Sequence, residues 1–407
     1  MTKANQNHWQ DQLASLDQLL CQTEQLWREQ PFKVERPQWC EYYPQLCDAL
    51  LALDDSQLAD LNQQPHQLLP WLAQQLPELG ETLRQIEALS QIDNLEENEL
   101  PAIANRFFDS VPGRKRAQIE AFTSTLGTVN QPVIEWCGGK GFLGRLMGQV
   151  WQQPVTTLEW DQQLCRAGEQ LAQKHKIDQQ FYEQDVLQPE LPVSLTDKHA
   201  VALHACGELH RQLVRQGVAQ DASRLDIAPC CYAVGMEGEY RPFNNFTQLQ
   251  LQRDDLRLAV TEAVTAAPRE LRQRDQDMAW KLAFNALRND LSGVSYQTLK
   301  PVPKAWLKAG FEGYCRKLAE REGLVLPETV DWEQYRQQGV ERQRAVMRLQ
   351  LVRHGFRRAI ECWLVLDLIC WMQQQGYHVT LGAFCERNLT PRNLLISARR
   401  EASVEAV

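Results

Sequence analysis

The pattern of apolar and polar positions changes twice along the chain. Up to about residue 110, apolar residues recur at helical spacing and prolines repeatedly interrupt the pattern; the clearest run is Leu13, Leu16, Leu19 and Leu20. We therefore predict a helical N-terminal domain over residues 1–110. Its leucines and tryptophans are typical of a small packed core, and a surface that binds a protein partner is the alternative.

Beyond residue 112, helical stretches alternate with short apolar runs. The pattern predicts a helix over Pro112–Leu126, closed by Gly127, whose lack of a side chain suits a left-handed helix end. The runs predict strands at Pro132–Trp136, Val155–Leu158, Ala200–His204 and Leu225–Ala228. Strands that alternate with helices indicate βαβ units and a parallel sheet.

Long polar helices interrupt this alternation between about 236 and 340, and we interpret that stretch as an insertion. The helices predicted there are Leu249–Ala266, Arg269–Leu287 and Ala305–Gly323. A helix over Arg344–Gln375 follows, and then come two strands, Tyr377–Ala383 and Asn393–Ser397, that are too close for a crossover and predict a hairpin. We predict an α/β fold with a seven-stranded sheet whose last strand is antiparallel, and domain segments 1–110, 111–235, 236–340 and 341–400.

Composition narrows the class of protein. With 407 residues, two or three domains are expected, and no apolar run is long enough to span a membrane. The N-terminus lacks the apolar core of a signal peptide, and the twelve cysteines form no Cys-x-x-Cys pair, so we expect a cytoplasmic protein with reduced thiols. A net charge of −9 argues against unspecific coating of nucleic acid, although it allows a local basic groove.

The strongest local pattern is a glycine-rich turn between a predicted strand and a helix. After the apolar strand comes Glu135-Trp136-Cys137-Gly138-Gly139-Lys140-Gly141. Glycines let a backbone approach a ligand closely, and a helix N-terminus presents free N–H groups. The segment lacks the Gly-Lys-Ser/Thr of a Walker A loop, but it matches the dinucleotide spacing Gly-x-Gly-x-x-Gly. Glu135 favours another ligand, since a carboxylate attracts the ammonium group of S-adenosylmethionine and repels a pyrophosphate.

Two further acids follow in the order that such a cofactor requires. Glu159 ends the second strand, 20 residues after Gly139, where a carboxylate can bind both ribose hydroxyls. Asp185 and Val186 then offer an acid for the adenine amino group and an apolar face for the ring. The ordered set predicts a nucleoside cofactor bound by Glu135, Cys137, Gly138, Gly139, Gly141, Glu159, Asp185 and Val186.

The ends of the next two strands carry distinctive residues. One reads His204-Ala205-Cys206-Gly207-Glu208-Leu209 and the other Pro229-Cys230-Cys231-Tyr232. With the basic helix start Gly113-Arg114-Lys115-Arg116 and the glycine loop, these motifs resemble class I S-adenosylmethionine-dependent methyltransferases. The nearest resemblance is to the "methyltransferase domain" family of methyltransferase-like 25 type, and the tRNA acceptor-stem ribose methyltransferases are more distant. The resemblance to methyltransferases covers about residues 112–235 and 345–400.

This resemblance implies a Rossmann-like domain that uses S-adenosylmethionine. It also implies that His204 and Cys206 border the transferred methyl group. Cys137 departs from the general pattern, which has glycine there, and cysteine is small enough to allow cofactor binding. Tyr232 is a candidate to stack on a planar acceptor, and Cys230 and Cys231 are candidates to contact the substrate.

The histidine and the cysteines allow several interpretations. His204, Cys206, Cys230 and Cys231 are a possible zinc set, but adjacent cysteines on a strand point to opposite faces, so we predict no metal site. A thiolate nucleophile that adds to a pyrimidine is a second possibility, and small residues that shape a pocket are a third. In a fourth interpretation, His204 or Tyr232 positions or deprotonates the methyl acceptor.

Basic residues point to the class of acceptor. The helix predicted near residue 350 carries arginines that form either a solvated face or a phosphate track: Arg342, Arg344, Arg348, Arg353, Arg357 and Arg358. Arg114 and Lys115 add charge in the same domain. We therefore expect RNA as the acceptor and partner, with no membrane role. A protein methyltransferase and an inactive cofactor-binding scaffold, which holds a partner through its N-terminal helices, remain as alternatives.

Overall fold

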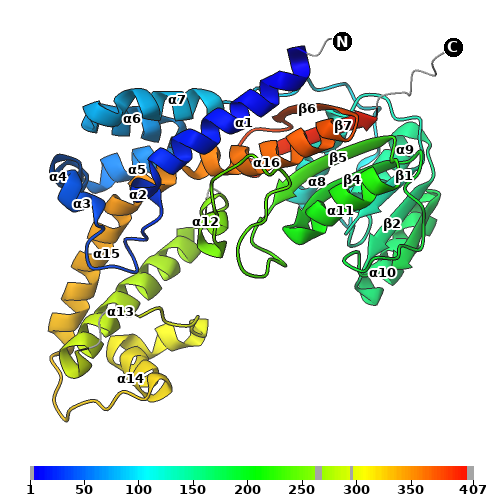
Figure 1. Cartoon of the computed structure of the whole chain (residues 1–407). Helices are drawn as coiled ribbons and strands as arrows, with labels where there is room; N and C mark the ends of the chain where they lie inside the picture. The colour runs from blue at the N-terminus through cyan, green and yellow to red at the C-terminus, as the bar shows by residue number, and fades with distance from the viewer. Residues whose placement is uncertain (1–3, 262–267, 294–296, 401–407) are drawn as a thin grey trace. The chain divides into compact units, whose positions relative to one another are not determined.

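The computed structural model describes residues 4–261, 268–293 and 297–400. The chain divides into two compact units, each assembled from separate stretches of sequence (Figure 1). The sheet unit comprises residues 1–21, 88–264 and 357–407, and the helical unit comprises residues 22–87 and 265–356. These units cut across the boundaries predicted at 110, 235 and 340.

A seven-stranded sheet forms the centre of the sheet unit. Its strands are β1 (Val133–Trp136), β2 (Val155–Glu159), β3 (Gln179–Glu183), β4 (His199–Cys206), β5 (Arg224–Cys230), β6 (Tyr377–Ala383) and β7 (Leu394–Arg400). Their order is β3-β2-β1-β4-β5-β7-β6; β1 to β5 are parallel, and β7 is antiparallel to both its neighbours. The predicted topology, including the terminal hairpin, is confirmed. The sequence analysis missed β3, whose five residues include only Phe181 and Tyr182 as apolar positions.

Helices cover the sheet, as doubly wound topology requires. Those of the sheet unit are α1 (Ala4–Gln22), α8 (Gly113–Ser124), α9 (Phe142–Trp151), α10 (Gln162–His175), α11 (Glu208–Ala219), α12 (Arg253–Leu258) and α16 (Arg357–Gln374), with the 3₁₀ turn η3 (Asn105–Phe108). The helix predicted after residue 112 is confirmed as α8, and Gly127 has the expected positive φ of 66°. The helix predicted over Leu249–Ala266 is shorter than expected, because only α12 is helical there; residues 262–266 lie outside the described residues.

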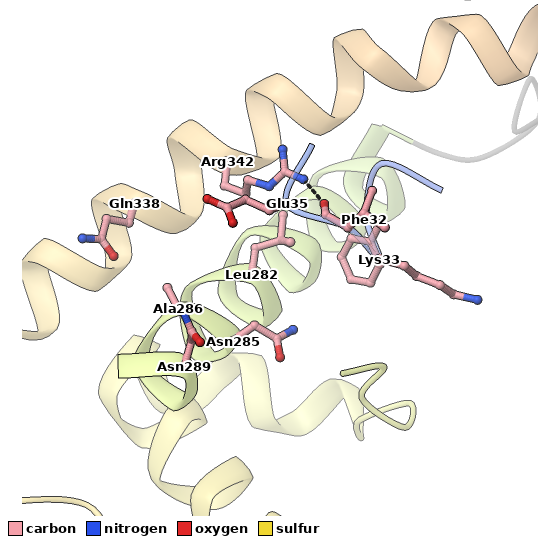
Figure 2. A pocket seen from close by; sticks show the side chains of 10 residues that line it. Phe32, Lys33, Glu35, Leu282, Asn285, Ala286, Asn289, Gln338 and Arg342 are labelled. Atoms are coloured by element: carbon pink, nitrogen blue, oxygen red, sulfur yellow. Dashed lines mark hydrogen bonds between the residues drawn. The ribbon is translucent and has the colours of Figure 1, made fainter. Parts of the chain in front are cut away.

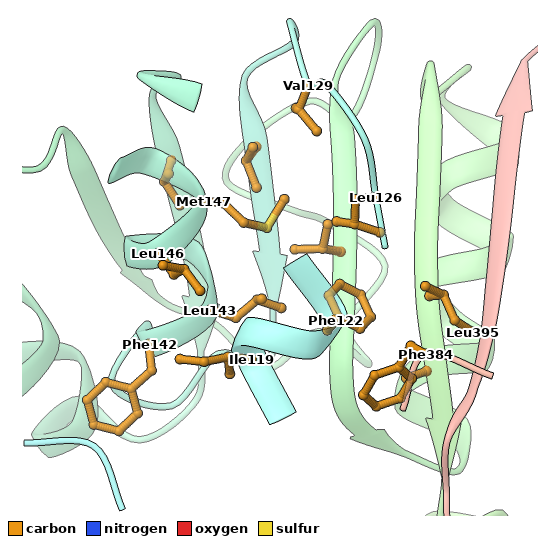
Figure 3. Close-up of a cluster of buried hydrophobic side chains, with 14 of the residues drawn as sticks. Ile119, Phe122, Leu126, Val129, Phe142, Leu143, Leu146, Met147, Phe384 and Leu395 are labelled. Carbon is orange, nitrogen blue, oxygen red and sulfur yellow. The ribbon is translucent and has the colours of Figure 1, made fainter. Parts of the chain in front are cut away.

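One hydrophobic layer joins α8 and α9 to the sheet (Figure 3). Ile119 and Phe122 of α8 meet Leu143 and Met147 of α9, and all four are at least 97% buried. Each such side chain contributes roughly 1.5–3 kcal/mol when it leaves water. The apolar face of α9 therefore fixes the helix that follows the glycine loop, and with it the geometry of the loop.

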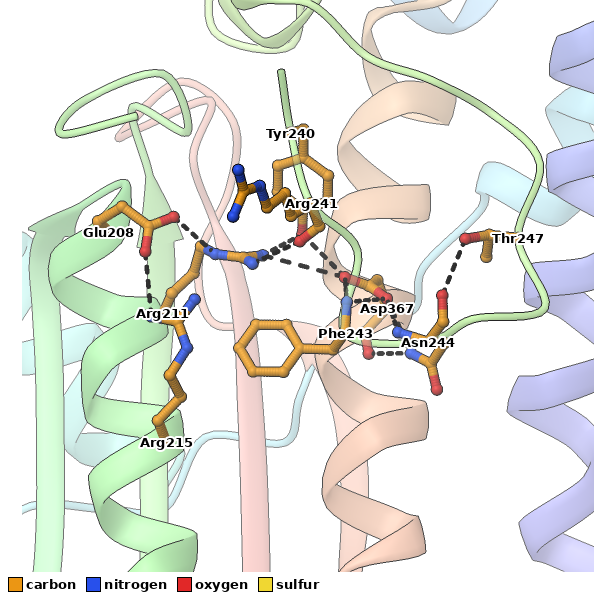
Figure 4. A network of polar contacts seen from close by, with 9 residues as sticks. All are labelled: Glu208, Arg211, Arg215, Tyr240, Arg241, Phe243, Asn244, Thr247 and Asp367. Carbon is orange, nitrogen blue, oxygen red and sulfur yellow. Dashed lines mark hydrogen bonds and ion pairs between the residues drawn. The ribbon is translucent and has the colours of Figure 1, made fainter. Parts of the chain in front are cut away.

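A polar network anchors the segment that follows β5 (Figure 4). The buried carboxylate of Asp367 on α16 accepts hydrogen bonds from the Tyr240 hydroxyl at 2.9 Å, the Phe243 amide at 2.9 Å and the Asn244 amide at 3.0 Å. Arg211 of α11 pairs with Glu208 at 2.8 Å and donates to the Tyr240 hydroxyl. The network ties an irregular segment to two helices of the sheet unit.

The helical unit has its own core. Its elements are α2 (Glu24–Trp27), α3 (Trp39–Tyr42), α4 (Pro44–Leu51), α5 (Asp55–Gln63), η1 (Pro65–Gln67), α6 (Leu68–Gln75), η2 (Pro77–Leu79), α7 (Gly80–Ser90), α13 (Pro268–Ser292), η4 (Lys304–Ala309), α14 (Gly310–Glu322) and α15 (Trp332–Gly355). Phe284 of α13 and Tyr314 of α14 lie in one buried cluster. A cavity of about 560 Å³ lies between α13, α15 and the segment around Phe32 and Lys33 (Figure 2).

The arginines expected on one helix near residue 350 have structural partners instead. The chain forms two helices here, α15 and α16, which belong to different units. Three guanidinium groups of α15 donate to backbone carbonyls of the same unit: Arg342 to Pro31 at 2.7 Å, Arg348 to Leu53 at 2.7 Å and Arg353 to Trp27 at 2.6 Å. Arg358 pairs with Glu361 at 2.7 Å. Arg344 is exposed. A solvated face or phosphate track does not describe Arg342, Arg348 and Arg353, because they bind carbonyls that would otherwise lose their water.

Within the described residues, the helices are too short or too polar to cross a membrane.

Candidate active site

The glycine loop joins β1 to α9 through three residues with a left-handed backbone. Cys137, Gly139 and Gly141 have φ values of 54°, 61° and 65°. A side chain at Gly141 would collide with Gln179 and Phe181, whereas a side chain at Gly139 would meet no atom within 4 Å. Only glycine therefore fits at position 141. The space next to Gly139 is open, which leaves room for a ligand on that side of the loop.

Glu135 lies beneath this loop, at the end of β1. Its carboxylate accepts hydrogen bonds from the Thr157 hydroxyl at 2.9 Å and from the Gly144 amide, and it is only 4% exposed. Burial raises the pKa of Glu135, and these hydrogen bonds oppose the shift. A Cβ at Gly144 would lie 2.6 Å from the same carboxylate. The structure thus gives Glu135 a role in supporting the loop, while its predicted contact with a cofactor ammonium group stays a prediction.

Glu159 lies at the end of β2 and is 5% exposed. One of its oxygens accepts a hydrogen bond from the Gly139 amide at 2.8 Å, and the other accepts from the Asp161 amide at 3.1 Å. Asp161 in turn caps α10, accepting from the Gln163 amide at 2.8 Å. The carboxylate is therefore fixed beside the glycine loop, and its predicted contact with ribose hydroxyls stays a prediction.

Electrostatic contacts place the predicted cofactor residues in one neighbourhood. Burial, followed by the negative charges of Glu159 and Asp185 and by Cys206, raises the pKa of the Cys137 thiol to about 12. Cys137 is therefore a neutral thiol at the loop, with acids from β2 and the end of β3 close by. Asp185 is exposed and Val186 is buried, consistent with a polar contact and an apolar face. Glu159 and Asp185, from the ends of β2 and β3, thus lie close to Cys137, and the predicted binding of a cofactor by these residues stays a prediction.

His204 lies at the end of β4, within reach of α8. Its Nε2 is 2.9 Å from Oε1 of Gln118, and its φ is 71°. Although the residue keeps accessible surface, burial of the ring lowers the pKa of His204, and the positive charges of Lys115 and Arg392 lower it further. A neutral imidazole at pH 7 follows. A non-glycine residue in this conformation costs about 1–3 kcal/mol, and such strain concentrates at functional sites.

Three thiols converge beside this histidine. The sulfur atoms of Cys206, Cys230 and Cys231 all lie within 4.8 Å of one another, and those of Cys206 and Cys230 are 3.3 Å apart. The sequence argument that adjacent cysteines diverge is wrong here, because β5 ends at Cys230 and Cys231 turns out of the strand with a φ of 47°. Hydrogen bonds from the other two thiols hold the pKa of Cys231 below its ordinary value.

Tyr232 does not lie where the sequence analysis expected it. The residue is 4% exposed, and its ring packs edge-on against His210 with centroids 5.8 Å apart. Burial raises the pKa of Tyr232 well above its ordinary value. The ring points into the interior because Cys231 has already turned the chain out of the strand. The predicted stacking on a planar acceptor does not fit this position.

Several residues of the site escaped the sequence analysis. Thr157 and Gln179 bind each other at 2.9 Å and hold Glu135, and Gln118 holds His204. Arg145 is fully buried between the rings of Phe107 and Phe142. The only sequence signal for Gln179 was a polar residue at the start of a short strand.

Comparison with known proteins agrees with the fold. The model of one protein family, described as a methyltransferase domain, matches residues 114–235. A search of curated proteins found no match.

Solved structures also resemble the chain. A tRNA (uracil-54, C5)-methyltransferase of Pyrococcus abyssi, with S-adenosyl-L-homocysteine, is 13% identical over 34% of this chain and 33% of its own, with a TM-score of 0.23. The 23S rRNA methyltransferase ErmE is 14% identical over 49% and 97%, with a TM-score of 0.24. Coclaurine N-methyltransferase is 13% identical over 88% and 96%, with a TM-score of 0.26. The chain spans about a third of the length of the tRNA methyltransferase.

Residues 114–235 therefore match a methyltransferase domain, and they lie in the unit that holds the seven-stranded sheet and the glycine loop. The predicted resemblance to S-adenosylmethionine-dependent methyltransferases is confirmed for this stretch, and S-adenosylmethionine is the cofactor that such a domain indicates.

Proposed function

We propose that the chain transfers a methyl group from S-adenosylmethionine to RNA, with the acceptor placed at the ends of β4 and β5. The methyltransferase domain match and the sheet order support the transfer. When bound, S-adenosylmethionine supplies a methyl group on a positively charged sulfur, which a nucleophile can take directly. The remaining steps fall to the residues of this chain.

The loop residues fit this cofactor. A side chain at Gly138 or Gly141 would collide with neighbouring atoms, so the loop is tightly packed from below, while the side of Gly139 is open. The two oxygens of Glu159 accept hydrogen bonds from the Gly139 and Asp161 amides, which fixes the carboxylate beside the loop. In our proposal Glu159 binds the ribose hydroxyls, Asp185 and Val186 take the adenine, and Glu135 keeps the loop in shape.

His204 is the proposed proton acceptor for the methylated group. A general base works best when its neutral form is present at the working pH, and the lowered pKa of His204 provides this. The 2.9 Å contact with Gln118 fixes the ring. The side chain therefore combines accessibility, a fixed position and the right protonation state, which supports a role next to the acceptor.

The RNA assignment is carried by one observation: His204 contacts α8 through Gln118 at 2.9 Å, and the first turn of that helix carries Arg114 and Lys115 in a chain whose net charge is −9. Cations grouped beside a catalytic edge suit a phosphate backbone, since phosphate contacts supply most of the unspecific affinity for nucleic acids. Arg114 is exposed at the start of α8.

The test is tritium transfer from labelled S-adenosylmethionine into extracts of a strain that lacks the gene. RNA, protein and small molecules are separated after incubation with the purified chain, and His204→Ala serves as the control. We expect label in RNA with the unmodified chain and at least a hundredfold less with His204→Ala. Label in protein alone would overturn the RNA assignment, and no label in any fraction would favour the scaffold alternative.

A further inference from the structure

Three thiol groups meet at the ends of β4 and β5, outside the loop that fits the cofactor. Cys206 ends β4, Cys230 ends β5, and Cys231 follows directly. We infer that these three cysteines form a zinc site with three protein ligands. The inference concerns metal binding and does not depend on the proposed RNA methylation.

The spacing of the sulfur atoms fits a metal better than a disulfide. Zinc binds thiolates at about 2.3 Å in a tetrahedron, which places the sulfurs roughly 3.8 Å apart. The three sulfurs lie within 4.8 Å of one another, and one pair is 3.3 Å apart, so both extremes lie within about 1 Å of that spacing. A disulfide needs about 2.05 Å, and it would leave the third thiol unused. The spacing therefore admits one ion bound by all three sulfurs, in place of the hydrogen bond that joins Cys206 and Cys230.

The backbone around the thiols is arranged to bring them together. Cys231 and Gly207 both have positive φ values, 47° and 57°. A side chain at Gly207 would collide with the carbonyl oxygen of Val234, which already accepts the Glu208 amide at 3.0 Å. The Gly207 amide donates to the Cys230 carbonyl at 3.1 Å. Hydrogen bonds thus lock the turn after β4 onto the turn after β5.

The position of the cluster suggests what kind of zinc site it is. Cys230 is 4% exposed, while Cys206 and Cys231 are half-buried, so an ion would be sheltered from one side and accessible from the other. Structural zinc sites are closed by four protein ligands, and sites with three keep one position for water or substrate. The open position lies at the same strand ends as His204. The fourth ligand of the zinc ion would therefore be a water molecule or a small electron-donating group of the acceptor.

Elemental analysis of the full-length chain tests the inference. The protein is purified without chelator after expression in zinc-supplemented medium, and we expect about one zinc per chain. Cys206→Ser and Cys231→Ser should each lower the zinc content at least tenfold. Cys165→Ser is the matched control, because this buried thiol donates to the Glu159 carbonyl at 3.5 Å, a contact that serine retains, and lies outside the cluster. It should keep its zinc.

A second measurement avoids substitutions that could prevent folding. The unmodified chain is stripped of metal and titrated with Co²⁺, whose intense visible absorption reports tetrahedral thiolate ligands, and Zn²⁺ should then abolish the signal. Bound zinc should also protect Cys206 and Cys231 from alkylation at least tenfold. The inference is overturned by a metal-free chain that binds neither ion, by stoichiometric iron or copper in place of zinc, or by a Cys206–Cys230 disulfide found by mass spectrometry.

Discussion

The two halves of the sheet's carboxyl edge are built by different means. At the ends of β1 and β2, the polar side chains are held by hydrogen bonds within the domain, as Glu135 is by Thr157 and Glu159 by the Gly139 amide. At the ends of β4 and β5, two non-glycine residues have positive φ values and reactive side chains are gathered: His204 and Cys231. The first half is a cradle whose acids are held by hydrogen bonds, and the second half gathers a histidine and thiols. Left-handed non-glycine residues occur in both halves, since Cys137 in the glycine loop has a φ of 54°.

The largest effect is expected from a side chain added to the glycine loop, compared with the same substitution at a glycine outside the loop. Gly139→Leu should abolish binding of S-adenosylhomocysteine, at least a hundredfold, because the side chain fills the open space above the loop. Gly127→Leu is the matched control: its φ of 66° imposes the same strain, it also meets no atom within 4 Å, and it lies outside the loop. Calorimetry should show normal binding for this variant. Equal losses in both would show that backbone strain, and not the cradle, decides binding.

The next largest effect is expected at the ends of β4 and β5, from the loss of the His204 side chain. His204→Ala should lower turnover by roughly 10²–10⁴, the usual contribution of a general base, and leave cofactor affinity within a few-fold. Single-turnover kinetics and calorimetry measure the two quantities separately. Parallel losses of turnover and affinity would move His204 from the acceptor side to the cofactor side.

Removing one carboxylate should distinguish the roles of the two acids. Glu159→Gln should weaken S-adenosylhomocysteine binding about tenfold, because an amide accepts less strongly from ribose hydroxyls and from the Gly139 amide. Glu135→Gln should mainly lower the midpoint of denaturation, since its partners lie in the interior. Calorimetry and urea unfolding of both variants test this assignment, and an exchange of the two effects would contradict it.

Replacing Arg114 and Lys115 together by alanine should produce a smaller effect, seen in the salt dependence. If each contacts one phosphate of a single strand, the slope of log K against log salt should become less steep by about 1.4. Fluorescence anisotropy with a labelled RNA at several salt concentrations measures the slope. An unchanged slope would remove these residues from the RNA surface.

The pH dependence of turnover should be the subtlest readout. Because the pKa of His204 is lowered from 6.5, the neutral base predominates at pH 7, so turnover should be flat there and should fall as pH drops below about 6.5. A stopped assay between pH 5 and 8 checks this. His204→Ala should lose the acidic limb, and an unchanged limb would assign it to another group.

The contrast between the two halves of the sheet's carboxyl edge also explains which features could be predicted from the sequence and which could not. Periodicity and glycine spacing act locally, so the strand–loop–helix at Glu135 and the terminal hairpin were predictable. The partner of Glu135 was not, because Thr157 reaches it only through the register in which β1 pairs with β2. The convergence of Cys206 and Cys231 depends on a single backbone turn at the end of β5, which leaves no composition signal.

The burial of long polar side chains is the second feature that the sequence analysis predicted wrongly. Arginines of α15 follow a helical spacing typical of an exposed face, yet Arg348 and Arg353 are at least 91% buried and bind carbonyls that are distant in the sequence. Their stems pack as apolar groups do, and their heads satisfy backbone acceptors. Sequence spacing alone does not distinguish this arrangement from a solvated one.

The most direct test of the account is calorimetric titration of the full-length chain with S-adenosylhomocysteine and, separately, with NADH. The Gly-x-Gly-x-x-Gly spacing of the glycine loop also occurs in dinucleotide-binding folds, whereas the match of residues 114–235 to a methyltransferase domain favours S-adenosylmethionine. We therefore expect saturable binding of S-adenosylhomocysteine at one site per chain, with no heat from NADH. Tight NADH binding without any response to the sulfur compound would contradict it.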